Sequence, residues 1–223
     1  MQNISRKRRS YKRFRGFGIC TIACIQVILS SCSLFENKKT TSITDDQLKK
    51  EIQAGLCLSA SGRGRITTGK EKNRFTYQSQ IKNHVFELAI DIPFKGQETL
   101  KLPLRKPFKF SGSIYSKTKK ELSSSKHRNI EKIFDAFLFR SAKFFAYASN
   151  EESCENISCL SGTLEKLNDA VAYQAPISKR FVFDLELKNN IQGHYRNISI
   201  RTSDAANAGK PLLALDLIVD SCQ

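Results

Sequence analysis

The chain has 223 residues and a formal net charge of +16. Seven of its 37 basic residues lie within the first 15 positions, so the remainder carries 30 basic against 21 acidic residues, about +9. The lysines are scattered and form no basic stripe interleaved with aromatic residues, so we expect no nucleic-acid partner.

The amino-terminal segment has the layout of an export signal. Basic residues cluster between Arg6 and Arg15, an apolar run follows over 16–28, and small residues precede Cys32. The run is shorter than the roughly 20 residues that a transmembrane helix needs. We interpret residues 1–31 as a signal peptide. The alternative is a plain signal peptide or a signal anchor, with Cys32 present by chance, and both the Sec and the twin-arginine export routes stay open.

The end of this segment, Leu29-Ser30-Ser31-Cys32, resembles the bacterial lipobox. The resemblance implies that Cys32 carries a diacylglycerol and an acylated amino group, and two or more chains anchor a protein stably. Ser33 stands where an aspartate retains enterobacterial lipoproteins in the inner membrane. We therefore expect lipid anchoring to the periplasmic face of the outer membrane, with residues 32–43 as a tether.

The folded domain is expected over residues 44–223. A helix begins at Thr44, where Gln47 completes a capping box. Period-two alternation then predicts five short strands between Leu58 and Phe110. Residues 116–128 are polar and are expected to form a loop.

An apolar second helix is expected from Asn129 to about Ser149, and further alternating strands run from Val171 to Val219. With about nine strands and no βαβ pattern, we predict a mainly β domain with two helices, which belongs to the α+β class. Its sheet is expected to be antiparallel and curved, or a half-open β-barrel with a helical lid.

Four cysteines remain in the expected exported chain: Cys57, Cys154, Cys159 and Cys222. An even number in an oxidising compartment indicates two disulfides, for which three pairings exist. We favour Cys154–Cys159 and Cys57–Cys222. A zinc site is the rival interpretation, but the spacing lacks a C-x-x-C pair, so we expect no metal.

No catalytic motif stands out. His84, His127 and His194 have no second titratable motif nearby in sequence, and each is interpreted as a surface or hydrogen-bonded histidine. Glu87 and Asp91 share the polar face of one strand, where a solvated surface is the ordinary interpretation. We expect no enzyme and no cofactor; the alternative is a hydrolase whose carboxylates come from distant parts of the chain and converge in a cleft.

One region resembles the opening of the LolB family of outer-membrane lipoprotein receptors. The matching stretches are Leu58–Ile66, Arg74–Tyr77, Phe86–Phe94, Gly96 and Glu98–Leu102. The resemblance implies a half-open antiparallel barrel, helices over its concave face, a cavity for acyl chains and no catalysis. It also implies exchange of lipoproteins with a LolA-like periplasmic carrier.

On this hypothesis the protein helps to localise or insert lipoproteins. Phe94 occupies the turn that contacts the membrane in the family, with Phe94 folded back onto the domain as the alternative. The alternative function is a structural or interaction lipoprotein of the envelope without lipid transfer. The predicted lining of the acyl cavity is Phe75, Tyr77, Phe86, Leu88, Ile90, Leu100, Leu102, Phe134, Phe137 and Phe144.

Overall fold

The computed structural model describes residues 44–68, 71–93, 96–122 and 128–222. The chain divides between Lys38 and Lys39, and every described residue belongs to the unit that follows. The predicted signal peptide, Cys32, the tether over 32–43 and Phe94 lie outside the described residues.

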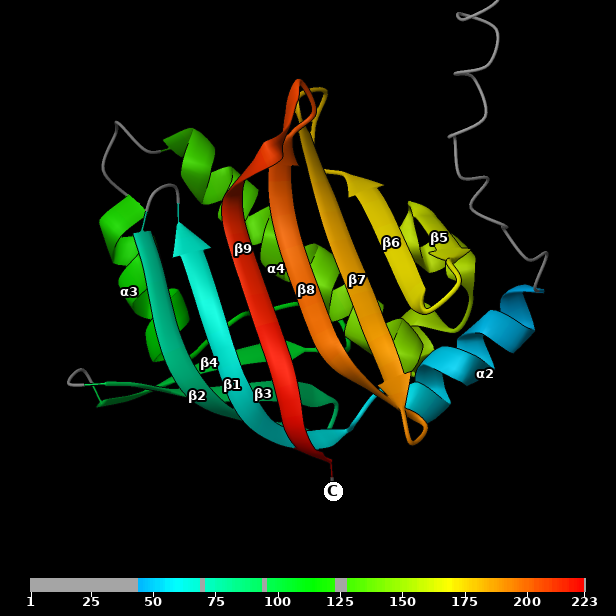
Figure 1. Ribbon diagram of the computed structural model, residues 1–223. Helices are drawn as coiled ribbons and strands as arrows, with labels where there is room; N and C mark the ends of the chain where they lie inside the picture. Colours follow the sequence, from blue (N-terminus) through cyan, green and yellow to red (C-terminus); the bar gives the residue numbers. More distant parts are fainter. Residues whose placement is uncertain (1–43, 69–70, 94–95, 123–127, 223) are drawn as a thin grey trace, which may run out of the picture. The chain divides into compact units, whose positions relative to one another are not determined.

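Nine antiparallel strands form one sheet in the order β4-β3-β2-β1-β9-β8-β7-β6-β5, and the sheet does not close (Figure 1). The carboxy-terminal strand β9 pairs with β1, which places the two ends of the domain side by side at the middle of the sheet. The strands are β1 (Ser59–Thr68), β2 (Glu71–Lys82), β3 (Val85–Ile92), β4 (Gly96–Pro103), β5 (Thr163–Lys166), β6 (Ala170–Pro176), β7 (Phe181–Ile191), β8 (His194–Asp204) and β9 (Asn207–Cys222).

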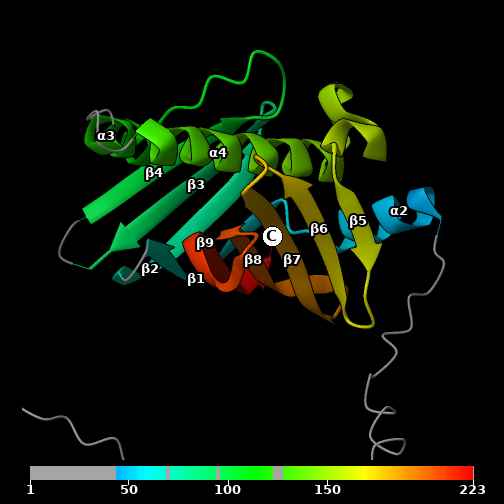
Figure 2. The same ribbon diagram turned by 90° about the horizontal axis from the view of Figure 1, so that it is seen from above.

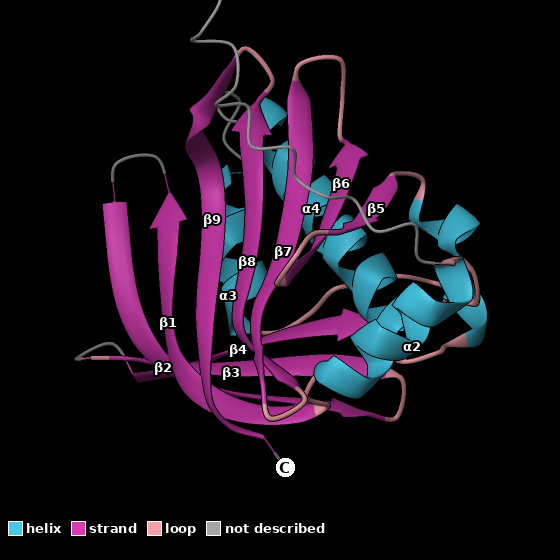
Figure 3. Cartoon of the chain, turned by 45° about the vertical axis from the view of Figure 1, so that its right-hand side comes forward, coloured by secondary structure: helices cyan, strands magenta, loops and turns pink. Residues whose placement is uncertain are grey.

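The sheet is bent through β1 and β2, so that β3 and β4 run across the direction of β7 to β9 (Figure 3). Two glycines of β1 lie at this bend. A Cβ on Gly62 would meet the carbonyl oxygen of Ile218 at 1.9 Å, and one on Gly64 would meet the ring of Phe75 at 2.4 Å. The close backbone approach that these glycines suggested is therefore present.

Helix α4 (Arg128–Ala148) lies along the concave side of the sheet (Figure 2). Helix α2 (Asp45–Gly55) precedes β1, and Thr44 and Gln47 form the predicted capping box at its start. Helix α3 (Ser113–Leu122) and the 3-10 turns η2 (Glu152–Cys154) and η3 (Ile157–Leu160) flank α4 in the chain.

The predicted mainly β class with a curved antiparallel sheet is confirmed, but two local predictions are wrong. Phe108 and Phe110 lie in an irregular segment after β4, where their rings pack against Phe139 and Tyr115. The polar stretch read as a loop instead contains α3, so the described residues hold three α-helices rather than two. The short strand β5 was not predicted.

Candidate functional site

The ten residues predicted to line an acyl cavity all lie in one core on the concave side of the sheet. They come from β2, β3, β4 and α4, and none is more than 8% exposed. Alternation along the strands places them there, because successive strand side chains point to opposite faces. The sequence therefore identified the apolar wall of the sheet.

Side chains of α4 fill the space against this wall. Phe145 stacks on Phe86 with ring centroids 4.2 Å apart, and Phe144 stacks on Tyr173 at 5.8 Å. Phe137 contacts Phe183 edge to face at 5.9 Å. These contacts make α4 an integral part of the core, and the role of the ten residues in acyl binding stays a prediction.

Two hydroxyl groups in the interior have no hydrogen-bond partner among the described residues. They belong to Tyr77 in β2 and Thr202 in β8, both buried. Burial and the charge of Asp220 raise the pKa of Tyr77 well above its usual value, so the phenol stays protonated. A buried donor without an acceptor costs roughly 1–3 kcal/mol, so each hydroxyl is a place where water or a polar ligand atom would be stabilised.

The opposite, polar face of the sheet is hollowed where it bends. A pocket of about 680 Å³ crosses β1, β2 and β3, and it adjoins pockets of about 410 and 690 Å³ on either side. Its members lie in cross-strand register, Ser61 opposite Gln78 and Arg63 opposite Thr76. We call this surface the outer groove, and its lining includes Ser61, Arg63, Thr76, Gln78, Ala89 and Asp91.

Most charges beside the outer groove are paired with one another. Arg63 lies 3.0 Å from Asp220, and Asp216 accepts hydrogen bonds from Arg65 at 2.9 Å and Arg201 at 3.2 Å. Burial opposes ionisation of Asp216, but the bonds from Arg65, Ser199 and Arg201 outweigh it and its pKa lies below the usual value. The groove therefore offers small polar side chains and amides rather than an excess of one charge.

The candidate titratable residues do not converge on a reactive centre among the described residues. Glu87 accepts a hydrogen bond from Lys101 at 2.7 Å, which lowers its pKa and disfavours a role as a general acid. His84 lies 2.8 Å from Glu151, on a different part of the domain. His127 lies outside the described residues.

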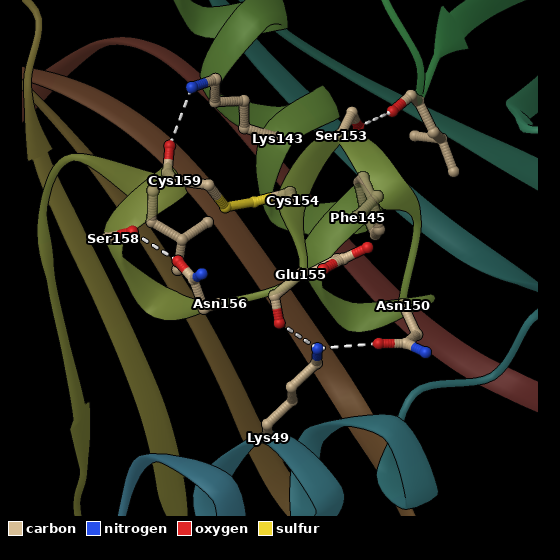
Figure 4. Close-up of a disulfide and its surroundings, with 12 residues drawn as sticks. Lys49, Lys143, Phe145, Asn150, Ser153, Cys154, Glu155, Asn156, Ser158 and Cys159 are labelled. Atoms are coloured by element: carbon tan, nitrogen blue, oxygen red, sulfur yellow. Dashed lines mark hydrogen bonds between the residues drawn. A yellow bond between two sulfur atoms is a disulfide. The ribbon is translucent and has the colours of Figure 1, made fainter.

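The structure pairs the cysteines as the sequence favoured. Cys57 joins the start of β1 to the end of β9 through Cys222, with Cα atoms 5.5 Å apart. Cys154 and Cys159 close a short loop beside α4, where Lys143 and Lys49 also donate hydrogen bonds to backbone carbonyls (Figure 4). His194 lies within 4.8 Å of the Cys57–Cys222 sulfurs. Because the two sulfurs are bonded to each other, they are not thiolates that could bind a metal.

Sequence reasoning missed the outer groove and the ion pairs that flank it. Its residues come from five strands, so they are neighbours only across the sheet and not along the chain. The one available signal was the run of small polar residues around the glycines of β1.

No family model, curated protein or solved structure matches the chain. Within the described ranges, no helix has the length and apolar character needed to cross a membrane.

Proposed function

We propose that this is an exported, lipid-anchored protein of the cell envelope that acts as an interaction module. In this proposal Cys32 carries the lipid, the outer groove binds an extended polar segment of an envelope partner, and the domain transfers no lipid. The observation that carries the proposal is the contrast between the two faces of the sheet: the apolar side is packed and the polar side is hollow.

The magnitude of the packing supports this role over acyl transport. Seven large side chains of α4 are buried, and full burial of each contributes roughly 1.5–3 kcal/mol. Lifting the helix therefore costs about as much as unfolding a typical domain, roughly 5–15 kcal/mol. The seven are Ile133, Phe134, Phe137, Leu138, Phe144, Phe145 and Tyr147.

A second candidate is acyl-chain binding of the LolB type, in which the curved sheet acts as a half-open barrel and α4 as its lid. The unpartnered Tyr77 hydroxyl on the concave wall favours it, because a lipid carbonyl could accept that hydrogen bond. An acyl chain contributes roughly 0.8 kcal/mol for each buried CH₂, so a long chain would at best balance the loss of the α4 contacts.

Metabolic labelling with an alkyne fatty acid tests the lipid anchor. The wild-type chain is expected to be labelled and to sediment with membranes, whereas Cys32→Ser should lose both properties. Cys24→Ser, within the expected signal peptide, is the matched control and should retain both. Labelling that persists in Cys32→Ser would contradict the proposed anchor.

Site-specific photocrosslinking in cells tests the outer groove. A photoreactive residue at Gln78 should give discrete protein adducts, and the same residue at Lys50, exposed on α2, should not. Ala89→Arg fills the groove between β2 and β4 and should abolish the adducts. Adducts that survive this substitution, or that form equally at Lys50, would argue against the groove.

A further inference from the structure

A second surface lies on the far side of α4 from the sheet. Phe139 points out of α4 and is half-buried, and the ring of Phe108 meets it edge to face with centroids 5.2 Å apart. Phe108 belongs to the segment between β4 and α3 that runs over α4 (Figure 2). Four basic residues accompany these rings: Lys106 and Lys109 lie within two residues of Phe108 in the chain, and Arg140 and Lys143 lie within four residues of Phe139 on α4. We call this surface the basic patch.

None of the four basic residues forms an ion pair with a described residue, although most other arginines near the sheet do. Arg140 donates to the carbonyl oxygens of Leu160 and Pro176 at 3.0 Å, and Lys143 donates to that of Cys159 at 2.8 Å. These neutral acceptors hold the two cations in place without cancelling their charge.

The cations also repel one another. Burial, together with the neighbouring charges of Arg140 and Lys106, holds the pKa of Lys143 below its ordinary value. The Lys143 ammonium lies 5.3 Å from the centroid of the Phe139 ring. An anion placed over the patch would relieve the repulsion, and cations interleaved with aromatic rings are typical of surfaces that contact membrane interfaces.

We propose that the basic patch docks onto anionic phospholipid headgroups, with Phe108 and Phe139 at the level of the interface. Docking through this side of α4 would turn the outer groove, on the opposite face of the sheet, away from the bilayer. A basic surface on a lipid-anchored domain supplies the second attachment that the domain needs to take a fixed orientation at the membrane. This docking role rests on the proposed location in the envelope. The experiment nevertheless uses the protein without its lipid anchor, so that the patch is tested by itself.

The test uses the unlipidated fragment 33–223, which keeps the whole core because every core residue lies between Leu48 and Val219. Its partition into vesicles of phosphatidylglycerol and phosphatidylcholine is compared with partition into phosphatidylcholine alone. We expect binding to the anionic vesicles only, and weaker binding at high salt.

The variant Lys106→Gln/Lys109→Gln removes two exposed charges and should weaken partition about thirty-fold, at roughly 1 kcal/mol for each basic residue near the surface. Lys50→Gln/Lys72→Gln removes two exposed charges elsewhere and should bind nearly as the wild type does. Circular dichroism of each variant checks that the fold is intact.

Equal losses in both double variants would overturn the proposal, because net charge alone would then explain binding. Absence of binding to the anionic vesicles would also overturn it and would favour an acidic protein as the partner of the patch. Neither outcome bears on the outer groove, so failure here is distinguishable from failure of the proposed function.

Discussion

Phe86 of β3 and Phe145 of α4 stack with ring centroids 4.2 Å apart and planes inclined by 6°. The contact joins the concave wall of the sheet to the helix that covers it, at a distance that leaves no room for a ligand between the rings. It is the clearest single sign that α4 belongs to the core of the domain.

Truncation of this stack should be severe. We expect Phe145→Ala to lower the free energy of unfolding by about 3–5 kcal/mol, because it removes buried apolar area and leaves a cavity. Phe139→Ala, on the half-buried outward side of the same helix, should cost clearly less. Urea denaturation of the 33–223 fragment measures both, and similar losses would contradict the assignment of α4 to the core.

The bend of the sheet depends on the absence of a side chain at Gly62. Gly62→Ala should destabilise the domain by about 3 kcal/mol, because the new Cβ would meet a backbone carbonyl that cannot rotate away. Ser61→Ala, one residue earlier, should cost little. Thermal unfolding compares the two, and a Gly62→Ala variant as stable as the wild type would show that the strands can separate there.

The pH dependence of stability should reflect Glu151, which accepts hydrogen bonds from His84 at 2.8 Å and Arg105 at 3.0 Å. Burial opposes ionisation of Glu151, but these two partners outweigh it and its pKa lies below the ordinary 4.5. The ionised form is therefore favoured in the folded state, and its contribution is complete above pH 4.5 and lost as the pH falls through the folded-state pKa.

Glu151→Gln should accordingly lower the free energy of unfolding by roughly 1–3 kcal/mol at pH 6 and by much less at pH 3. Glu152→Gln, whose carboxylate is largely exposed, is the control and should change little at either pH. An equal deficit at both pH values would rule out ionisation of Glu151 as the source of the effect.

The Cys57–Cys222 disulfide closes the longer loop, with a sequence separation of 165 residues against 5 for Cys154–Cys159. Replacing both Cys57 and Cys222 by alanine should cost about 2–5 kcal/mol, more than the same change at the short loop, because more chain entropy is released on unfolding. Calorimetry of the two double variants gives the comparison, and a larger loss at the short loop would reverse this order.

Alternation of apolar residues found the strands that build the concave wall, since Phe75 and Tyr77 or Leu88 and Ile90 must share a face in any extended chain. The same signal failed at Phe108 and Phe110, whose rings are held by Phe139 and Tyr115 rather than by a strand partner. Local spacing does not distinguish these two situations, because the partners lie far away in the sequence.

Helix α3 escaped prediction because its sequence is mostly polar and none of its residues is buried. The outer groove escaped for another reason. Its side chains are adjacent only across strands, from residues far apart in the sequence. The sequence located the apolar wall of the sheet correctly. It could not show whether a cavity lies between that wall and α4, because this depends on how the side chains of α4 pack onto the sheet.

Titration of a fluorescent acyl probe into the 33–223 fragment tests the packed interior most directly. We predict no saturable binding at micromolar concentration, and no change in the urea midpoint when the probe is present. Saturable one-to-one binding that stabilises the fragment, and that Tyr77→Phe weakens, would contradict this prediction and would restore acyl-chain binding as the function of the concave face.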